Sequence, residues 1–200
     1  MSGFRRAGAH VVVAVVVGLL LAPGGASSQS AATRSPGKAG ASPGAQGTAQ
    51  AMDTTWAAWR LVLGDWTAEE GGGAPGAASG GGESFRRALD GRILERRHWS
   101  AYPATASRPA FRNEGLMIVY PERGSYRAIA FDNEGHVIRY AATAADSAVV
   151  LVSDAVAGEP RFRLSYRPEP GGRIGIRFEM APPGQPEAFR TYVEGRAHRR

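Results

Sequence analysis

The strongest constraint on the fold is a run of short segments from Ser84 to His198 in which apolar and polar residues alternate. Asp-Gly, Asn-Glu-Gly and Pro-Gly-Gly sequences separate these segments, and no second long helical pattern interrupts them. A period of two is typical of strands that bury one face, and such sequences are typical of the turns between them. The pattern therefore predicts an all-β domain, either a sandwich or a barrel.

The segments follow one another at hairpin spacing, and Asp90-Gly91 is the strongest single hairpin signal. An antiparallel meander of about nine or ten strands tends to close on itself, because closure removes unpaired edges. We therefore expect an antiparallel up-and-down β-barrel preceded by one short helix. The expected strands are 64–70, 84–89, 92–100, 111–120, 126–131, 136–143, 148–153, 162–166, 173–180 and 188–197.

The N-terminus has the layout of a secretory signal peptide, residues 1–26. Arg5 and Arg6 precede an apolar run that ends at Pro23, and small residues follow it. Cleavage is expected after Ala26 or Ser28, and an uncleaved N-terminal anchor is the alternative. A lipid-modified lipoprotein is excluded because the chain has no cysteine. The protein is thus expected to be exported to the periplasm or the extracellular space, without stable membrane insertion after cleavage.

Two segments are low in complexity. Residues 27–50 contain almost no apolar bulk and are expected to form a disordered spacer, because they cannot offset their ordering entropy. Residues 71–82 are rich in glycine but lack the Gly-Lys-Ser/Thr ending of a phosphate-binding loop, so a flexible loop is expected. The remaining chain, 51–200, suffices for one domain with a single core. Without cysteine, that core must provide the stability.

A short amphipathic helix is expected to begin near Asp53, whose side chain can cap exposed amides. Trp56, Trp59 and Leu63 follow at helical spacing. We interpret this aromatic stripe as core that covers one end of the β-domain, with a ligand cage as the alternative.

The chain is basic, with a formal net charge of +6, which becomes +4 when the two arginines of the signal peptide are removed. Several arginines recur at every second residue, which places them on the solvated face of their strands. Because aromatic residues do not interleave with them on that face, a nucleic-acid partner is not expected. The arginines concerned are Arg161, Arg163, Arg167, Arg173 and Arg177.

Gly64-Asp65-Trp66, after a short helix, resembles the Gly-x-Trp opening of the calycin or lipocalin-like superfamily. Three other stretches resemble functionally uncharacterised bacterial exported proteins with a predicted lipocalin-like barrel. The resemblance implies that Trp66 closes one barrel end beneath an arginine of the last strand, either Arg190 or Arg196. The three stretches are Gly82-Glu83-Ser84, Leu89-Asp90-Gly91-Arg92 and Phe131-Asp132-Asn133-Glu134-Gly135.

The favoured function is a non-catalytic exported barrel that binds a small apolar ligand in its interior. Inward aromatic side chains on a closed barrel create a concave apolar site, although the same rings can instead fill the interior. The residues predicted to line the cavity are Trp66, Trp99, Phe131, Tyr140, Phe162 and Phe178.

Three alternatives remain. The resemblance allows a haem-binding barrel, for which His98 is the best-placed ligand, although no cofactor and no other metal site is expected. A hydrolase or isomerase would need a carboxylate or histidine in a cleft, but no catalytic residue is assigned. A cell-envelope interaction module is the third alternative. The candidates for acid or base chemistry are Glu95, His98, Asp132 and Glu134.

Overall fold

The alternating segments form ten strands, and each strand pairs in antiparallel register with the next along the chain. The computed structural model describes residues 55–69, 78–106 and 108–200. Its strands are β1 (Gly64–Ala68), β2 (Gly80–Ala88), β3 (Ile93–Tyr102), β4 (Phe111–Glu122), β5 (Ser125–Asp132), β6 (Val137–Ala145), β7 (Ala148–Ser153), β8 (Arg161–Glu169), β9 (Arg173–Ala181) and β10 (Arg190–Arg199).

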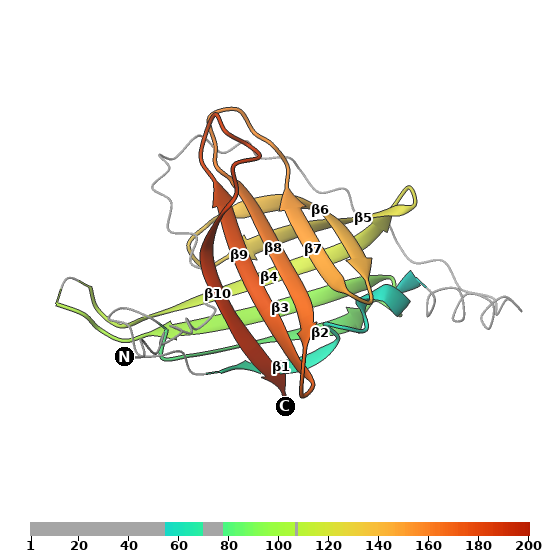
Figure 1. Cartoon of the computed structure of the whole chain (residues 1–200), viewed down its shortest axis with the longest axis horizontal. Helices are drawn as coiled ribbons and strands as arrows, with labels where there is room; N and C mark the ends of the chain where they lie inside the picture. The colour runs from blue at the N-terminus through green and yellow to red at the C-terminus, as the bar shows by residue number, and fades with distance from the viewer. Residues whose placement is uncertain (1–54, 70–77, 107) are drawn as a thin grey trace, which may run out of the picture.

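Pairing of β1 with β10 closes the sheet, so the up-and-down barrel predicted from the alternation is confirmed. In Figure 1 the strands β7 to β10 cross in front of β2 to β5 at a steep angle. Tight turns join neighbouring strands. Between β4 and β5, Arg123 and Gly124 both adopt positive φ angles, as the two-residue hairpin turn that matches strand twist requires.

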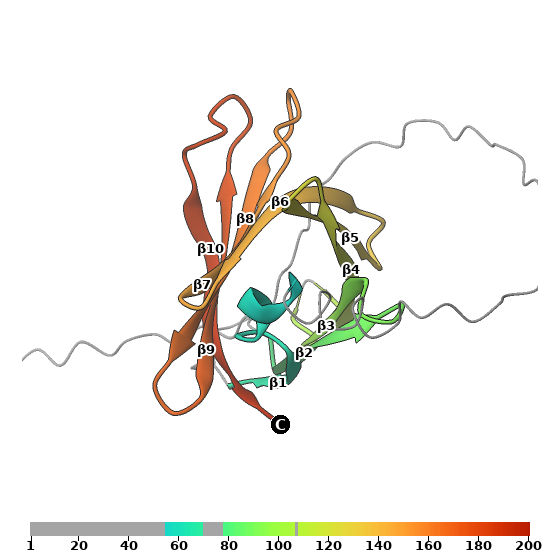
Figure 2. The ribbon, with the colours of Figure 1, turned by 90° about the vertical axis from the view of Figure 1, so that its right-hand side faces the viewer.

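The predicted helix is a single 3-10 turn, η1 (Ala57–Trp59), and no side chain caps its start. Asp53, the expected cap, lies outside the described residues. Trp56, Trp59 and Val62 are fully buried, and both indoles pack against Tyr126 with ring centroids 5.6 and 5.4 Å away. Figure 2 shows η1 between the two facing halves of the barrel. Tertiary packing rather than helix propensity holds this turn, which fills one end of the interior.

The glycine-rich segment is not a loop over its whole length, because β2 begins at Gly80, before the expected strand start at Ser84. Gly80 and Gly82 pair with β3 beside the Trp99 ring, and a Cβ atom on Gly82 would lie 2.9 Å from the Trp66 carbonyl oxygen. A Cβ atom on Gly82 would lie 3.1 Å from Trp99 Nε1. These glycines therefore make room for a large neighbouring ring within a paired strand.

The predicted signal peptide and spacer, residues 1–50, and residues 71–77 of the glycine-rich segment lie outside the described residues. Within the described part of the chain, no helix has the length and apolar character needed to cross a membrane.

Candidate functional site

The side chains predicted to line a cavity lie on both faces of the barrel wall. Tyr140, Phe162 and Phe178 are buried in the core together with Trp66, and the two phenylalanine rings stack 5.6 Å apart. Phe131 is 42% exposed and lies on the outer face. Trp99 also points outward, so the side chains of both residues lie on the outer face, although each residue borders one of the two small cavities described below.

Strand parity explains this error. On β3, Leu94, Arg96 and Ser100 are buried and point inward, which turns Trp99 to the outer face. The prediction favoured the aromatic residue for the interior, whereas the inward row contains a buried arginine. In the sequence of β3, both alternating sets of residues contain charged side chains. This is the one sequence signal that a charge lies inside the barrel.

The centre of the barrel contains a buried ion pair between Arg96 and Glu83, with 2.8 Å between Arg96 Nε and Glu83 Oε2. Both side chains are only 5% exposed. The Tyr166 hydroxyl also donates to Glu83 Oε2, at 3.0 Å, and burial raises the pKa of this tyrosine well above its ordinary value. Glu83 Oε1 is buried without a protein hydrogen-bond partner. Sequence reasoning named none of these three residues as a site.

His98 continues this network toward the barrel end. Arg96 Nη1 lies 3.1 Å from His98 Nδ1, and because a guanidinium can only donate, Nδ1 accepts this hydrogen bond. The proton of the neutral ring is therefore on Nε2, which donates to Asn113 Oδ1 at 3.3 Å. Asn113 Nδ2 in turn donates to Glu134 Oε1 at 2.9 Å. Burial, reinforced by the charge of Arg96, lowers the pKa of His98 to about 3, so its ring is neutral at physiological pH.

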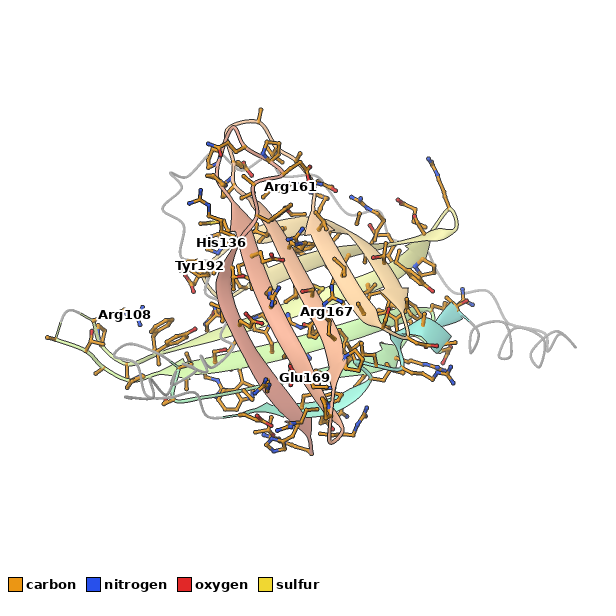
Figure 3. All side chains as sticks on the ribbon, viewed as in Figure 1. Arg108, His136, Arg161, Arg167, Glu169 and Tyr192 are labelled. Atoms are coloured by element: carbon orange, nitrogen blue, oxygen red, sulfur yellow. The ribbon has the colours of Figure 1, made fainter. Side chains whose placement is uncertain are left out.

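The proposed haem or metal ligand is thus occupied at both ring nitrogens, and binding iron would require breaking a hydrogen bond at one of them. Among the described residues, no group of three potential ligand side chains could hold a metal ion. The other candidates for acid or base chemistry are also engaged, since Glu95 pairs with Arg97 at 2.6 Å on the outer face and Asp132 pairs with His136 at 2.8 Å. His136 lies toward the barrel end opposite η1, as does Tyr192 (Figure 3).

Two small cavities adjoin the interior network. One, about 20 Å³, is bordered by Glu83, Arg96 and Ser100. The other, about 30 Å³, lies between Arg96 and the Asp132–His136 pair, beside Tyr140. Each holds roughly one or two water molecules, since one water needs about 10–15 Å³ by this kind of measure. Among the residues that the structure describes, these two cavities leave room for water but not for a larger molecule.

A larger concavity, about 550 Å³, lies on the outer face of strands β1 to β5. Its floor is the backbone of a row of cross-strand partners, in which every residue except Gly115 has a side chain that points inward. One wall is formed by the next row of cross-strand partners, whose side chains point outward and in which Leu116 pairs with Phe131. Trp99 and Glu114 stand on the opposite wall. The floor residues are Trp66, Glu83, His98, Gly115 and Asp132.

The charged side chains that the strands contribute to this groove are locally compensated, whereas Arg200, which follows β10 and also lines the groove, donates to Thr67 Oγ1 at 2.9 Å rather than to a carboxylate. Asp65 pairs with Arg86 at 2.9 Å, and Arg112 pairs with Glu114 at 2.6 Å while lying 4.1 Å from the Trp99 ring. Arg97, also in the groove, pairs with Glu95, as described above. The groove therefore combines exposed apolar side chains with polar groups that have little net charge.

Four of the five arginines predicted on the solvated face lie in ion pairs with described residues, and Arg167 is the exception. Arg163 contacts Glu179, and Arg177 contacts Glu194 at 2.7 Å. Arg167 and Glu169 lie on β8, toward the viewer in Figure 3. This part of the outer surface is a ladder of opposite charges across β8, β9 and β10 rather than a uniformly positive patch.

Trp66 is covered by an arginine of the last strand, but by Arg199 rather than Arg190 or Arg196. The guanidinium of Arg199 lies 4.5 Å from the centroid of the indole ring. Because β1 and β10 are antiparallel, Trp66 pairs with Arg199 at the very end of β10. Arg196 contacts Glu169 at 2.5 Å, and Arg190 lies at the other end of the strand.

The comparisons with known proteins add no family to this description. No protein-family model matches the chain, and no curated protein was found to be similar to it. The ten-stranded closed barrel is consistent with a calycin-like fold.

Proposed function

We propose that this protein is an exported, non-catalytic binding barrel that holds its ligand in the outer groove across β1 to β5. The observation that carries the proposal is size. Small-molecule sites measure about 300–1,000 Å³, and the groove of about 550 Å³ falls in that range, whereas the interior cavities of about 20 and 30 Å³ do not. The N-terminal signal pattern supports export.

Binding is favoured over catalysis because the carboxylates that line the groove are engaged in ion pairs. Arg97 and Arg112 each contact a glutamate at 2.6 Å. A general acid or base needs a shifted pKa and access to substrate. His98, whose pKa is lowered to about 3, points to the other side of the wall and is neutral.

A second candidate is the interior site favoured by the sequence. The cavity of about 30 Å³ is bordered by Arg96 and by the buried Tyr140, while Met117, Leu164 and Phe178 contribute apolar walls. The donors of Arg96, next to the Asp132–His136 pair, suit a carbonyl oxygen on a small molecule that has an apolar part. A neutral ligand fits best, because Glu83 already balances Arg96. Any ligand larger than water must displace side chains at this end of the barrel.

Backbone amide shifts would test the proposal. The mature protein would be titrated with a fluorescent fatty-acid analogue, a terpenoid, linear oligosaccharides and short peptides. We expect saturable shifts at Ser84, Leu116 and Phe131 for at least one compound. Loss of binding in Leu116→Arg, which fills the groove with charge, would support the assignment, since this side chain points away from the core.

The contrary result is equally specific. Shifts at Ala130 and Leu164, together with weaker binding by Tyr140→Phe but not by Tyr120→Phe, would transfer the site to the interior and overturn the groove. Tyr120 is the matched control because it lies on the outer face opposite Arg127. No saturable shift with any member of the panel would contradict both sites.

A further inference from the structure

The groove is elongated, and its length follows from the strands that it crosses. Floor residues follow the register from Trp66 on β1 to Asp132 on β5. Neighbouring strands lie about 4.8 Å apart, so five strands span about 19 Å. A ligand that uses the full groove must therefore be long and narrow, and it must lie across the strands rather than along them.

The floor argues against an extended peptide as the occupant. Peptides that bind sheets add a strand at an open edge, where main-chain hydrogen bonds provide affinity. In this barrel β1 to β5 are paired on both sides, and β1 closes onto β10. The backbone beneath the groove already makes its ladder hydrogen bonds, so the walls must provide the specific contacts.

The walls present two kinds of surface to such a ligand. Leu116 and Phe131 form adjacent apolar patches, and Phe131 is 42% exposed. Asn133 and Glu114 lie opposite, with the Arg112–Glu114 pair stacked beside Trp99. Aromatic rings attract apolar C–H faces, while planar amide, carboxylate and guanidinium groups bind hydroxyls. Because the carboxylates that line the groove are already paired, and Arg200 is the one lining arginine without an acidic partner among the described residues, a neutral ligand meets the smallest desolvation cost.

We propose that the groove binds a neutral linear oligosaccharide. A pyranose ring has an apolar C–H face and a rim of hydroxyls, and with its linkage it is about as long as the spacing between neighbouring strands. The groove therefore accommodates about four rings, one for each strand spacing. This inference rests on the proposed function, since it names the ligand class of the same site.

Calorimetric titration of the mature protein with cellotetraose, maltotetraose and tetra-N-acetylchitotetraose would test the inference. We expect saturable binding of at least one of them. For that sugar, affinity should rise with each ring added up to about four and then remain constant, because the groove ends there. A tetramer that binds no more tightly than its monomer would overturn the linear-ligand assignment.

Two exposed side chains provide a matched pair of variants. Phe131→Ala should weaken tetrasaccharide binding about tenfold, because it removes the exposed ring of the groove. Val137→Ala should leave binding unchanged, since Val137 pairs with Phe131 on the next strand and is 56% exposed but does not line the groove. Equal effects of the two substitutions would contradict the inference.

The panel separates failure of this inference from failure of the proposed function. Groove shifts produced by a peptide or an apolar probe, with no oligosaccharide binding, would refute the oligosaccharide and leave the groove as the site. Absence of groove shifts with every probe would refute both. Uronic-acid oligomers that bind more tightly than neutral sugars would refute the assignment of a neutral ligand.

Discussion

Removing one member of the buried Arg96–Glu83 pair should destabilise the barrel far more than removing both. Each side chain is 5% exposed, and the 2.8 Å contact is the closest countercharge of either group. Glu83→Gln leaves a buried guanidinium without its carboxylate, and Arg96→Met leaves a buried carboxylate without its cation. Loss of one partner of a buried pair costs about 3–5 kcal/mol of unfolding free energy.

The double variant Glu83→Gln/Arg96→Met should cost only about 1–3 kcal/mol. It contains no uncompensated charge, and the Tyr166 hydroxyl can still donate to the glutamine oxygen. The remaining loss comes from His98 Nδ1, which loses the donor that lies 3.1 Å away. The coupling energy between the two substitutions should therefore be at least about 2 kcal/mol.

Urea unfolding followed by tryptophan fluorescence would measure these values, because Trp56, Trp59 and Trp66 are buried in the same core. The exposed pair Arg177–Glu194 is the control. Its N–O distance is 2.7 Å, but its side chains are 48% and 54% exposed. Substitutions there should change stability by less than about 1 kcal/mol. The reasoning is refuted if Glu83→Gln is as mild as Glu194→Gln, or if the two buried substitutions are additive.

Three further predictions concern neighbouring parts of the barrel. As the pH is lowered from 6.5 to 3, the free energy of unfolding should fall by up to about 1.4 kcal/mol per pH unit. The reason is that His98 binds a proton near pH 6.5 in the unfolded chain but only near pH 3 in the folded protein. In His98→Gln, the urea midpoint should therefore change less across this pH range. Gly115→Ala should lower the free energy of unfolding by about 1–3 kcal/mol, since its Cβ would lie 2.1 Å from the His98 ring. Gly175→Ala should lower it by about 0.5 kcal/mol or less, because its Cβ meets only the flexible carboxylate of Glu169. Similar thermal midpoints for the two variants would contradict this prediction. Arg199→Gln should lower the free energy of unfolding by about 0.5–1 kcal/mol and change the fluorescence emission of Trp66. If Arg190→Gln has an equal effect, the cation over the Trp66 ring contributes nothing to stability.

Much of the architecture could be predicted because strand and turn signals are local. The hairpin expected at Asp90-Gly91 joins β2 and β3, and the expected strand 148–153 coincides with β7. The helix was harder to predict, because Trp56 and Trp59 follow helical spacing but form only one 3-10 turn. Burial of the two indoles against Tyr126, rather than a helical hydrogen-bond pattern, sets the conformation of that segment.

The candidate site was less predictable, since it depends on register between strands. Trp99 and Phe131 look like interior residues by size, yet strand parity turns both outward. Glu83 and Arg96 are ordinary surface types, but they meet inside the barrel. The groove exists only because residues from five strands align in rows, and no segment of the chain contains that alignment by itself.

Periodicity of two and glycine-containing turns specify this chain as a meander of antiparallel strands, because pleat geometry and turn conformation act over a few residues. The pairing of β1 with β10 places Arg199, rather than Arg190 or Arg196, over Trp66. Closure of the barrel also decides which of the two alternating sets of side chains on each strand faces inward, and hence which charges are buried. Those choices belong to the tertiary structure, because they follow from packing all ten strands around one limited interior volume.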